Sequence, residues 1–370
     1  SMGEILGFSV DYNRTKKEAL ITTTSSNPGQ GNPASPTPDT PKVPEIKGRV
    51  VLGNERLFTE YANLIDGKRV GLITNQTGVD ANGVPVAEKL KAYPNTKLVA
   101  LYSPEHGLDG KQPAGKYVKS YFDKKMNLPV YSLYGPTRKP SREMLQNVDV
   151  LLFDMQDIGS RTYTYISTLQ NAMVAAKENN IPIVVLDRPN PLGGTIVEGF
   201  LRETRLKSFV GIDKMPMAHG MTAGELGQFF NREIGADLTV VTMKNWTRNM
   251  VWQDTGLPFA QTSPNIPNLE SAFLYRATGS GEQTGIGQSE YFHWVGGKNL
   301  NSNEYARRLN ASGLPGVRFV PAPKGNRGGV RVKVTDWRSF NPARTGVYTL
   351  AVANQMRPIN VPECKKPYSM

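Results

Sequence analysis

Cysteine is almost absent from this sequence, which has 370 residues and one cysteine, Cys364. A single cysteine excludes a disulfide-stapled fold and a cysteine-rich zinc module. The three histidines, His106, His219 and His293, are too far apart for a helical HExxH zinc motif. No apolar run approaches the roughly 18 residues that a transmembrane helix needs. We therefore expect no metal centre and no membrane-spanning segment.

Nucleotide-binding and nucleophile motifs are also missing. The stretch Asn75–Asp80 follows an expected strand but lacks the GxGxxG pattern of dinucleotide sites, and Gly279-Ser-Gly281 lacks the third glycine. No Gly-Lys pair continues into Ser or Thr, and no GxSxG elbow is present. The sequence therefore predicts chemistry without a cofactor.

The formal net charge is +12, with 44 Lys and Arg against 32 Asp and Glu. Such a balance favours anionic partners, although it also serves solubility alone. Basic residues occur only in pairs such as Lys124-Lys125, with no dense basic run among aromatics. Nucleic-acid binding is accordingly the weakest hypothesis, and we expect no nucleic-acid partner.

Three regions are predicted along the chain. Residues 1–47 begin with Ser1-Met-Gly3, typical of an expression scar, and contain six prolines between 27 and 46, a composition typical of an extended linker. Residues 48–205 are predicted to form one domain. Residues 206–370 are predicted to form a smaller domain that completes a cleft.

Buried strands alternate with helices in the first of these domains. Continuous apolar runs predict strands at 69–74, 97–102, 148–153 and 183–186, and helical spacing predicts helices over 84–92 and 165–178. Such alternation predicts an α/β fold, a Rossmann-like doubly wound parallel sheet. Thr222 and Glu225 form a capping box in the smaller domain, and the tail alternates at 316–320 and 329–334, which predicts an antiparallel α+β domain.

Polar groups follow all four expected strands. Ligands of open α/β sheets bind at the carboxyl ends of the strands, so we expect these groups to converge. The alternative is that they only cap the following helices. The groups belong to the segments 75–77, 103–107, 154–163 and 187–191.

Carboxylates dominate these segments. Paired carboxylates of unequal pKa are the apparatus of glycoside hydrolysis, and amides and tyrosines suit sugar hydroxyls. Two purely structural alternatives remain open. Glu105 could pair with Lys111, and Asp157 could form an i,i+4 salt bridge with Arg161.

Six motifs in order resemble one family. They are Ser103-Pro-Glu-His-Gly107, Asp154-Met-Gln-Asp-Ile-Gly-Ser-Arg-Thr-Tyr163, Asp187-Arg-Pro-Asn-Pro191, His219-Gly-Met-Thr222, Asp254-Thr-Gly-Leu-Pro258 and Ser263-Pro-Asn-Ile-Pro267. Over roughly 48–350 the chain resembles the bacterial exo-β-N-acetylmuramidases (NamZ-type), long catalogued as a domain of unknown function. The family pattern Glu-Gly-Thr-Asn reads Glu282-Gln-Thr-Gly285 here.

The resemblance implies a glycoside hydrolase that releases terminal N-acetylmuramic acid from the non-reducing end of peptidoglycan fragments. Its partner would be a muropeptide or a MurNAc-GlcNAc substrate, and its location periplasmic, extracellular or lipid-anchored. The alternative is a non-catalytic binder of muropeptides or cell-wall sugars, which the altered 282–287 stretch favours. Oligomeric state is left open.

Site residues are assigned from the strand ends and the resemblance together. The glutamate of the Ser-Pro-Glu-His-Gly motif falls on Glu105, the expected general acid or base, and the second catalytic group is expected to be Asp157 or Glu282. Arg161 or Arg188 is expected to meet the lactyl carboxylate, because guanidinium forks suit carboxylates. The expected substrate-binding residues are Asn75, Gln76, His106, Asp154, Gln156, Arg161, Tyr163, Asp187, Arg188, Asn190, His219 and Thr284.

Overall fold

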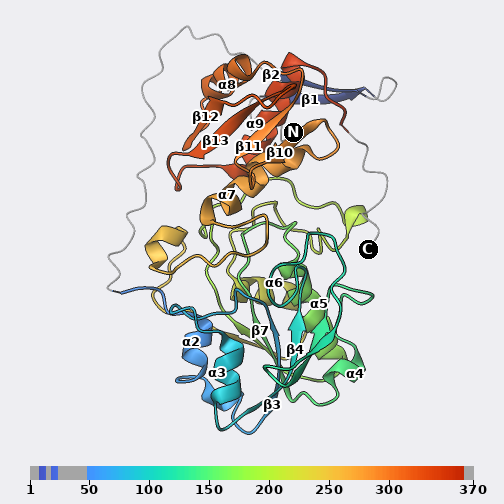
Figure 1. Ribbon diagram of the computed structural model, residues 1–370, viewed down its shortest axis with the longest axis vertical. Coiled ribbons are helices and arrows are strands. Elements are labelled where there is room, and N and C mark those ends of the chain that lie inside the picture. Colours follow the sequence, from blue (N-terminus) through green and yellow to red (C-terminus); the bar gives the residue numbers. More distant parts are fainter. Residues whose placement is uncertain (1–7, 14–17, 24–47, 362–370) are drawn as a thin grey trace.

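The computed structural model describes residues 8–13, 18–23 and 48–361. It has two main layers, a larger sheet with its helices and a smaller sheet with its helices, and helix α7 (Leu269–Thr278) lies between them (Figure 1). A separate antiparallel hairpin pairs β1 (Phe8–Asn13) with β2 (Glu18–Thr23). The predicted linker at 27–46 lies outside the described residues.

The larger sheet has seven strands, and all its pairings are parallel except that of the edge strand β5. The first of the parallel strands, β3, lies at the centre; the chain builds outward to one side and then returns to build on the other. This is the strand order of the Rossmann fold, with one added edge strand. In spatial order the strands are β5 (Tyr121–Asp123), β6 (Leu128–Ser132), β4 (Lys97–Ser103), β3 (Arg69–Thr74), β7 (Val150–Asp154), β8 (Ile183–Leu186) and β9 (Leu238–Val241).

Both faces of this sheet are covered, as the continuous apolar strands predicted. Leu152, Val184 and Leu186 belong to one hydrophobic cluster, while Phe153 and Val185, their neighbours in the chain, belong to the other. Period-two alternation between two buried clusters is the signature of a doubly wound sheet. Helices α2 (Gly53–Leu57) and α3 (Val86–Ala92) lie on one side of the strands, and α4 (Arg142–Leu145), α5 (Tyr165–Glu178) and α6 (Ala223–Ile234) are the others of this layer (Figure 1).

Strand β9 differs from the expected organisation. Residues 238–241 were expected in the smaller domain, but they pair in parallel with β8 as the seventh strand. The boundary at 205–206 therefore falls inside the larger unit. The reason is the long connection from β8 to α6, which interrupts the regular alternation of strand and helix that marked the domain in the sequence. The predicted capping box at Thr222 and Glu225 does begin α6.

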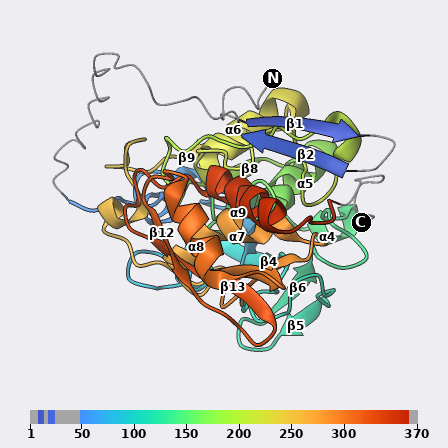
Figure 2. The ribbon, with the colours of Figure 1, turned by 90° about the horizontal axis from the view of Figure 1, so that it is seen from above.

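The smaller sheet is antiparallel, as predicted, with four strands. Helix α8 (Ser302–Ala311) packs on β12 and β13, and α9 (Pro342–Met356) packs on α7 and α8 (Figure 2). In spatial order the strands are β10 (Ile286–Ser289), β11 (Trp294–Lys298), β13 (Arg327–Val334) and β12 (Val317–Pro321). None of the helices in the described ranges has the length and apolar character needed to cross a bilayer.

A carboxylate of the larger layer reaches the start of α9. The Oε1 atom of Glu198 accepts a hydrogen bond from the backbone N–H of Ala343, at 3.2 Å, and Arg344 is the cation beside it. Burial raises the pKa of Glu198 to about 7, although these contacts favour the charged form. The two layers are thus joined by a carboxylate that titrates near neutral pH.

We expect this contact to make stability depend on pH. Because the folded-state pKa lies above the ordinary 4.5, the native protein holds a proton that the unfolded chain has lost between these values. Stability should therefore fall as pH rises from about 4.5 to about 7. Glu198→Gln keeps an oxygen acceptor for Ala343 and should remove this dependence of stability on pH. Above pH 7, its free energy of unfolding should exceed that of wild type by on the order of 2 kcal/mol. Urea unfolding across this range measures it, and parallel curves for the two proteins would contradict it.

Candidate active site

The site lies where the strand order reverses, between β3 and β7. Ligands of doubly wound sheets bind at this switch point, outside the carboxyl ends of the strands. The two loops are tied together, because the backbone N–H of Gln156 donates to Thr77 Oγ1 at 2.9 Å. Asn75 Oδ1 accepts from both the backbone and the hydroxyl of Thr77, which fixes the first loop. The sequence-predicted Asn75 and Gln156 are thus brought together.

A buried ion pair forms the floor of the site. Arg188 Nε lies 2.6 Å from Asp154 Oδ1, and a second nitrogen of its guanidinium lies 3.0 Å from Asp154 Oδ2. Asn54 also donates to this carboxylate, whose side chain is 0% exposed. Asp154 and Arg188 therefore neutralise each other's charge. Their contacts with each other hold the loops of the site in position. A substrate-binding role for either stays a prediction.

Asp157 forms a second pair, with His219. The Nδ1 atom of His219 accepts from the backbone N–H of Met221, so its proton is on Nε2, which donates to Asp157 Oδ2 at 3.1 Å. The backbone N–H of Gly159 donates to the same oxygen at 2.6 Å. The other oxygen, Oδ1, is buried with no hydrogen-bond partner among the described residues. The i,i+4 salt bridge with Arg161 is not formed.

Glu105 lies at the end of β4 and is 7% exposed. Its Oε2 accepts from Thr164 Oγ1 at 2.7 Å, and its Oε1 accepts from the backbone N–H of Gly115 at 2.8 Å. These contacts replace the alternative pairing with Lys111. The next residue, His106, has a left-handed backbone with φ of 71°, a conformation that side chains other than glycine adopt only when the surroundings impose it. Its Nδ1 contacts the Gln112 carbonyl at 2.7 Å, so the loop wraps around Glu105.

Two further predicted residues hold the loops in place. Asp187 accepts from the backbone N–H of Gly224 at 2.7 Å, at the start of α6, and burial raises its pKa to about 6. Asn190 donates to the Met221 carbonyl and accepts from Leu192. The contacts of Asp187 therefore agree with the alternative that polar groups after the strands cap the following helices. Contact with substrate stays a prediction for both residues.

Buried polar atoms without a protein partner concentrate at this edge of the sheet. Native proteins keep such atoms rare, and they cluster where water or a ligand binds. All of the following lie on the strand-end loops, on the β4 terminus or on the segment that crosses them: Asn75 Nδ2, Gln76 Oε1, Ser103 Oγ, Gln156 Oε1, Asp157 Oδ1, Tyr163 OH and Thr262 Oγ1.

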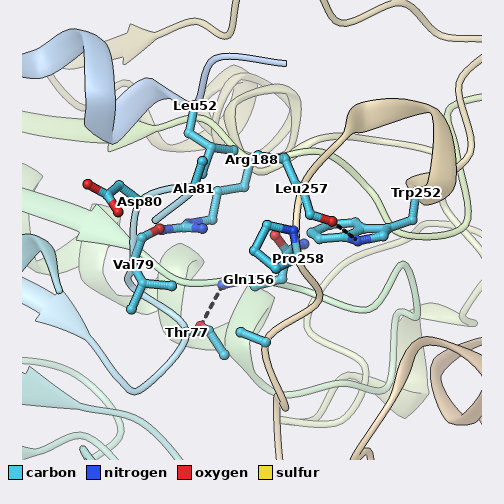
Figure 3. Close-up of a pocket in the computed structure, with 11 residues that line it drawn as sticks. Leu52, Thr77, Val79, Asp80, Ala81, Gln156, Arg188, Trp252, Leu257 and Pro258 are labelled. Atoms are coloured by element: carbon cyan, nitrogen blue, oxygen red, sulfur yellow. Dashed lines mark hydrogen bonds between the residues drawn. The ribbon is translucent and has the colours of Figure 1, made fainter. Parts of the chain in front are cut away.

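The segment from 252 to 263 covers these loops. Gln76 Nε2 donates to the carbonyls of Gln261 and Thr262, at 2.9 and 3.0 Å, and the Tyr165 hydroxyl also donates to the Thr262 carbonyl. Between this segment and the loops lies a small pocket that is partly open to solvent (Figure 3). It is lined by Thr77, Gln156, Arg188, Trp252 and Pro258, among others. Glu105 and Asp157 are not among its lining residues, although Gln156, the neighbour of Asp157 in the chain, is.

Glu282 and Thr284 are set apart from this cluster. Glu282 is exposed after the short helix at Gly279–Gly281, in the smaller layer. Thr284 uses its hydroxyl locally, on the Gly281 carbonyl at 2.6 Å. No contact joins either residue to Glu105 among the described residues. Their catalytic and binding roles stay predictions.

Several residues at the site were missed by sequence reasoning. Arg276 of α7 donates to Thr162 Oγ1 at 2.7 Å, and Tyr275 OH lies 3.2 Å from the same oxygen. Thr164 holds Glu105. In the sequence, Arg276 stands in an otherwise apolar stretch of α7. No sequence pattern reveals which residues this arginine contacts. No group of three or more His, Cys, Asp or Glu among the described residues is arranged to hold a metal ion.

Comparison with known proteins identifies the family of this chain. The model described as "Exo-beta-N-acetylmuramidase NamZ, N-terminal" matches residues 70–270, and that described as "Exo-beta-N-acetylmuramidase NamZ, C-terminal" matches residues 273–367. The chain belongs to the NamZ family. It is 46% identical over 340 residues to the peptidoglycan beta-N-acetylmuramidase NamZ of Bacillus subtilis (strain 168), covering 88% of this chain and 82% of that one.

Two solved structures are similar to this chain in fold and sequence. A DUF1343 family protein from Bacteroides fragilis NCTC 9343, solved at 1.65 Å, is 39% identical with a TM-score of 0.77, over 85% of this chain and 84% of that one. A second from the same organism, solved at 1.30 Å, is 26% identical with a TM-score of 0.59, over 83% and 92%. The boundary between the two NamZ models falls at the start of α7, which agrees with the assignment of β9 to the larger layer.

Proposed function

We propose that this NamZ family member is an exo-acting glycoside hydrolase that releases terminal N-acetylmuramic acid from the non-reducing end of peptidoglycan fragments. The observation that carries the proposal is 46% identity, over 88% of the chain, to a protein named for that activity. The cluster of unpartnered buried polar atoms at the switch point supports it, because amide and hydroxyl groups suit a sugar.

Glu105 is the proposed general acid. It is buried at the end of β4 and held at both oxygens by neutral donors, Thr164 and the Gly115 backbone, with no cation in salt-bridge contact among the described residues. Its carboxyl group is the proposed source of the proton that the leaving sugar oxygen takes up.

Asp157 is the proposed second carboxylate, in preference to Glu282. Its Oδ2 is occupied by Gly159 and His219, while its Oδ1 is unpartnered and available to a water or to the developing positive charge of the sugar. His219 acts as a positioning residue, because its tautomer is fixed by the Met221 N–H. Glu282 is exposed and has no comparable support.

Hydrolysis of a chromogenic β-N-acetylmuramide tests the function. We expect the wild-type protein to release the chromophore, and to free N-acetylmuramic acid from a MurNAc-GlcNAc disaccharide. The competing candidate is a non-catalytic sugar-binding protein, which the change of the family Asn to Gly285 favours. Tight binding of the disaccharide by calorimetry without any product would establish that candidate and overturn the proposed activity.

We also propose a periplasmic or extracellular location, because the polymer lies outside the cytoplasmic membrane. The net charge of +12 supports attraction to an anionic polymer. Fractionation of cells that express the full natural protein tests this, and a purely cytoplasmic signal would contradict it.

A further inference from the structure

Two arginines at the junction of the layers, the partly buried Arg161 and the buried Arg276, have no carboxylate partner among the described residues. Arg161 follows β7 in the larger layer, and Arg276 lies on α7, where the smaller layer begins. Thr162, next to Arg161, accepts a hydrogen bond from Arg276 at 2.7 Å, and the charge of Arg276 is one of the causes that lower the pKa of Arg161. Among the residues in the described ranges, no carboxylate oxygen forms a salt bridge with either one.

The known contacts of this pair are all neutral. Arg161 donates to the carbonyls of Phe200 and Met215, and Arg276 donates to the hydroxyls of Thr162 and Ser280. The Nε atoms of both arginines are buried and lack a hydrogen-bond partner among the described residues. Arg276 is only 9% exposed. Two like charges held this way are costly unless an anion joins them.

The electrostatics agree with this geometry. Burial, together with the positive charges of Arg276 and Arg202, lowers the pKa of Arg161 to about 10. Burial also lowers the pKa of Arg276. Both shifts mean that the surroundings disfavour the charged forms of the two arginines. A bound carboxylate would stabilise those charged forms.

One short segment of chain links Arg276 to Glu105. Thr162 contacts Arg276, and Thr164, two residues along the same segment, contacts Glu105. Two residues span at most about 7 Å of chain. The segment 162–164 therefore connects the surroundings of Glu105 with those of Arg276. Arg188, the other expected partner of the lactyl group, is already neutralised by Asp154.

We propose that Arg161 and Arg276 form the subsite that binds the carboxylate of the muramic acid lactyl group, with the Ser160, Thr162 and Tyr275 hydroxyls beside it. This proposal rests on the proposed hydrolase function. The subsite selects a negatively charged sugar, and the selection comes from both layers at once. A neutral sugar would leave both guanidinium groups without a counter-charge.

The test compares two chromogenic substrates that differ only in charge, a β-N-acetylmuramide and its lactyl methyl ester. We expect wild type to prefer the acid in kcat/KM by about 10- to 100-fold, the range of a hydrogen-bonded charge pair. Arg276→Gln and Arg161→Gln should reduce that ratio towards one, mainly by loss on the acid. Arg276→Lys should keep part of it.

Arg202→Gln is the matched control. Arg202 is 8% exposed and close to Arg161, but it donates only to carbonyls of its own loop, those of Asp213, Glu203 and Thr204. It should change stability and leave the acid-to-ester ratio as in wild type. If Arg161→Gln and Arg276→Gln lower both substrates equally, the carboxylate subsite is refuted while the hydrolase stands. If wild type hydrolyses neither substrate, the proposed function itself fails.

Discussion

Glu105→Gln is expected to lower kcat on a MurNAc-GlcNAc disaccharide by about 100- to 10,000-fold, the usual contribution of general acid–base catalysis. Glutamine has nearly the same shape and keeps an oxygen that can accept from Thr164 or Gly115. It has no ionisable proton to give to the leaving oxygen. The folded structure should therefore survive while the proton transfer is lost.

Measurements of kcat, KM and melting temperature separate these effects. Glu178→Gln is the matched control, because Glu178 ends α5, the helix that begins next to Thr164, and pairs with Lys139 at the surface. It should stay within about twofold of wild type. A leaving group of low pKa needs little protonation, so an activated aryl substrate should suffer less from Glu105→Gln than the natural disaccharide. Equal activity of wild type and Glu105→Gln on both substrates would exclude the role.

Asp154→Ala is expected to destabilise the protein by about 3–5 kcal/mol, because it leaves the Arg188 guanidinium buried without its carboxylate. Both side chains are buried, with Arg188 5% and Asp154 0% exposed, and Asn54 loses an acceptor as well. The loops after β7 and β8 share this pair, so the switch point itself should loosen. Denaturant unfolding gives the change in free energy.

Asp149→Ala supplies the comparison for that experiment. Asp149 pairs with Arg69 at the opposite end of the same two strands, β7 and β3, where both side chains are exposed. Its loss should matter far less, because water already screens that pair. The double change Asp154→Leu with Arg188→Met should recover much of the stability, since apolar side chains of similar size carry no desolvation cost. A loss for Asp154→Ala no larger than that for Asp149→Ala would contradict the assignment.

The sequence was sufficient to predict what depends on local pattern. The strands at 69–74 and 183–186, and the helix at 165–178, occur at the predicted residues. The order of the side chains along a strand determines which face of the sheet each one lies on. The doubly wound sheet could therefore be predicted as well. The convergence of polar strand ends followed from the same topology.

Contacts between distant segments could not be predicted in this way. No spacing rule connects Asp157 with His219, or Thr162 with Arg276, because each pair is joined only when loops fold over the sheet. For the same reason, the sequence could not choose between Arg161 and Arg188 as the free cation. That choice depends on Asp154, which lies 34 residues before Arg188 and neutralises it.

The position of α7 has a consequence for how members of this family diverge. Glu105 and Asp157 are encoded before this helix, and Arg276 is encoded within it. Bond cleavage is therefore encoded before α7, whereas the choice of sugar depends on Arg161 before this helix and on Arg276 within it. Recombination that exchanges the stretch from α7 onward between relatives would be expected to change one half of the carboxylate subsite while leaving Glu105, Asp157 and Arg161 in place.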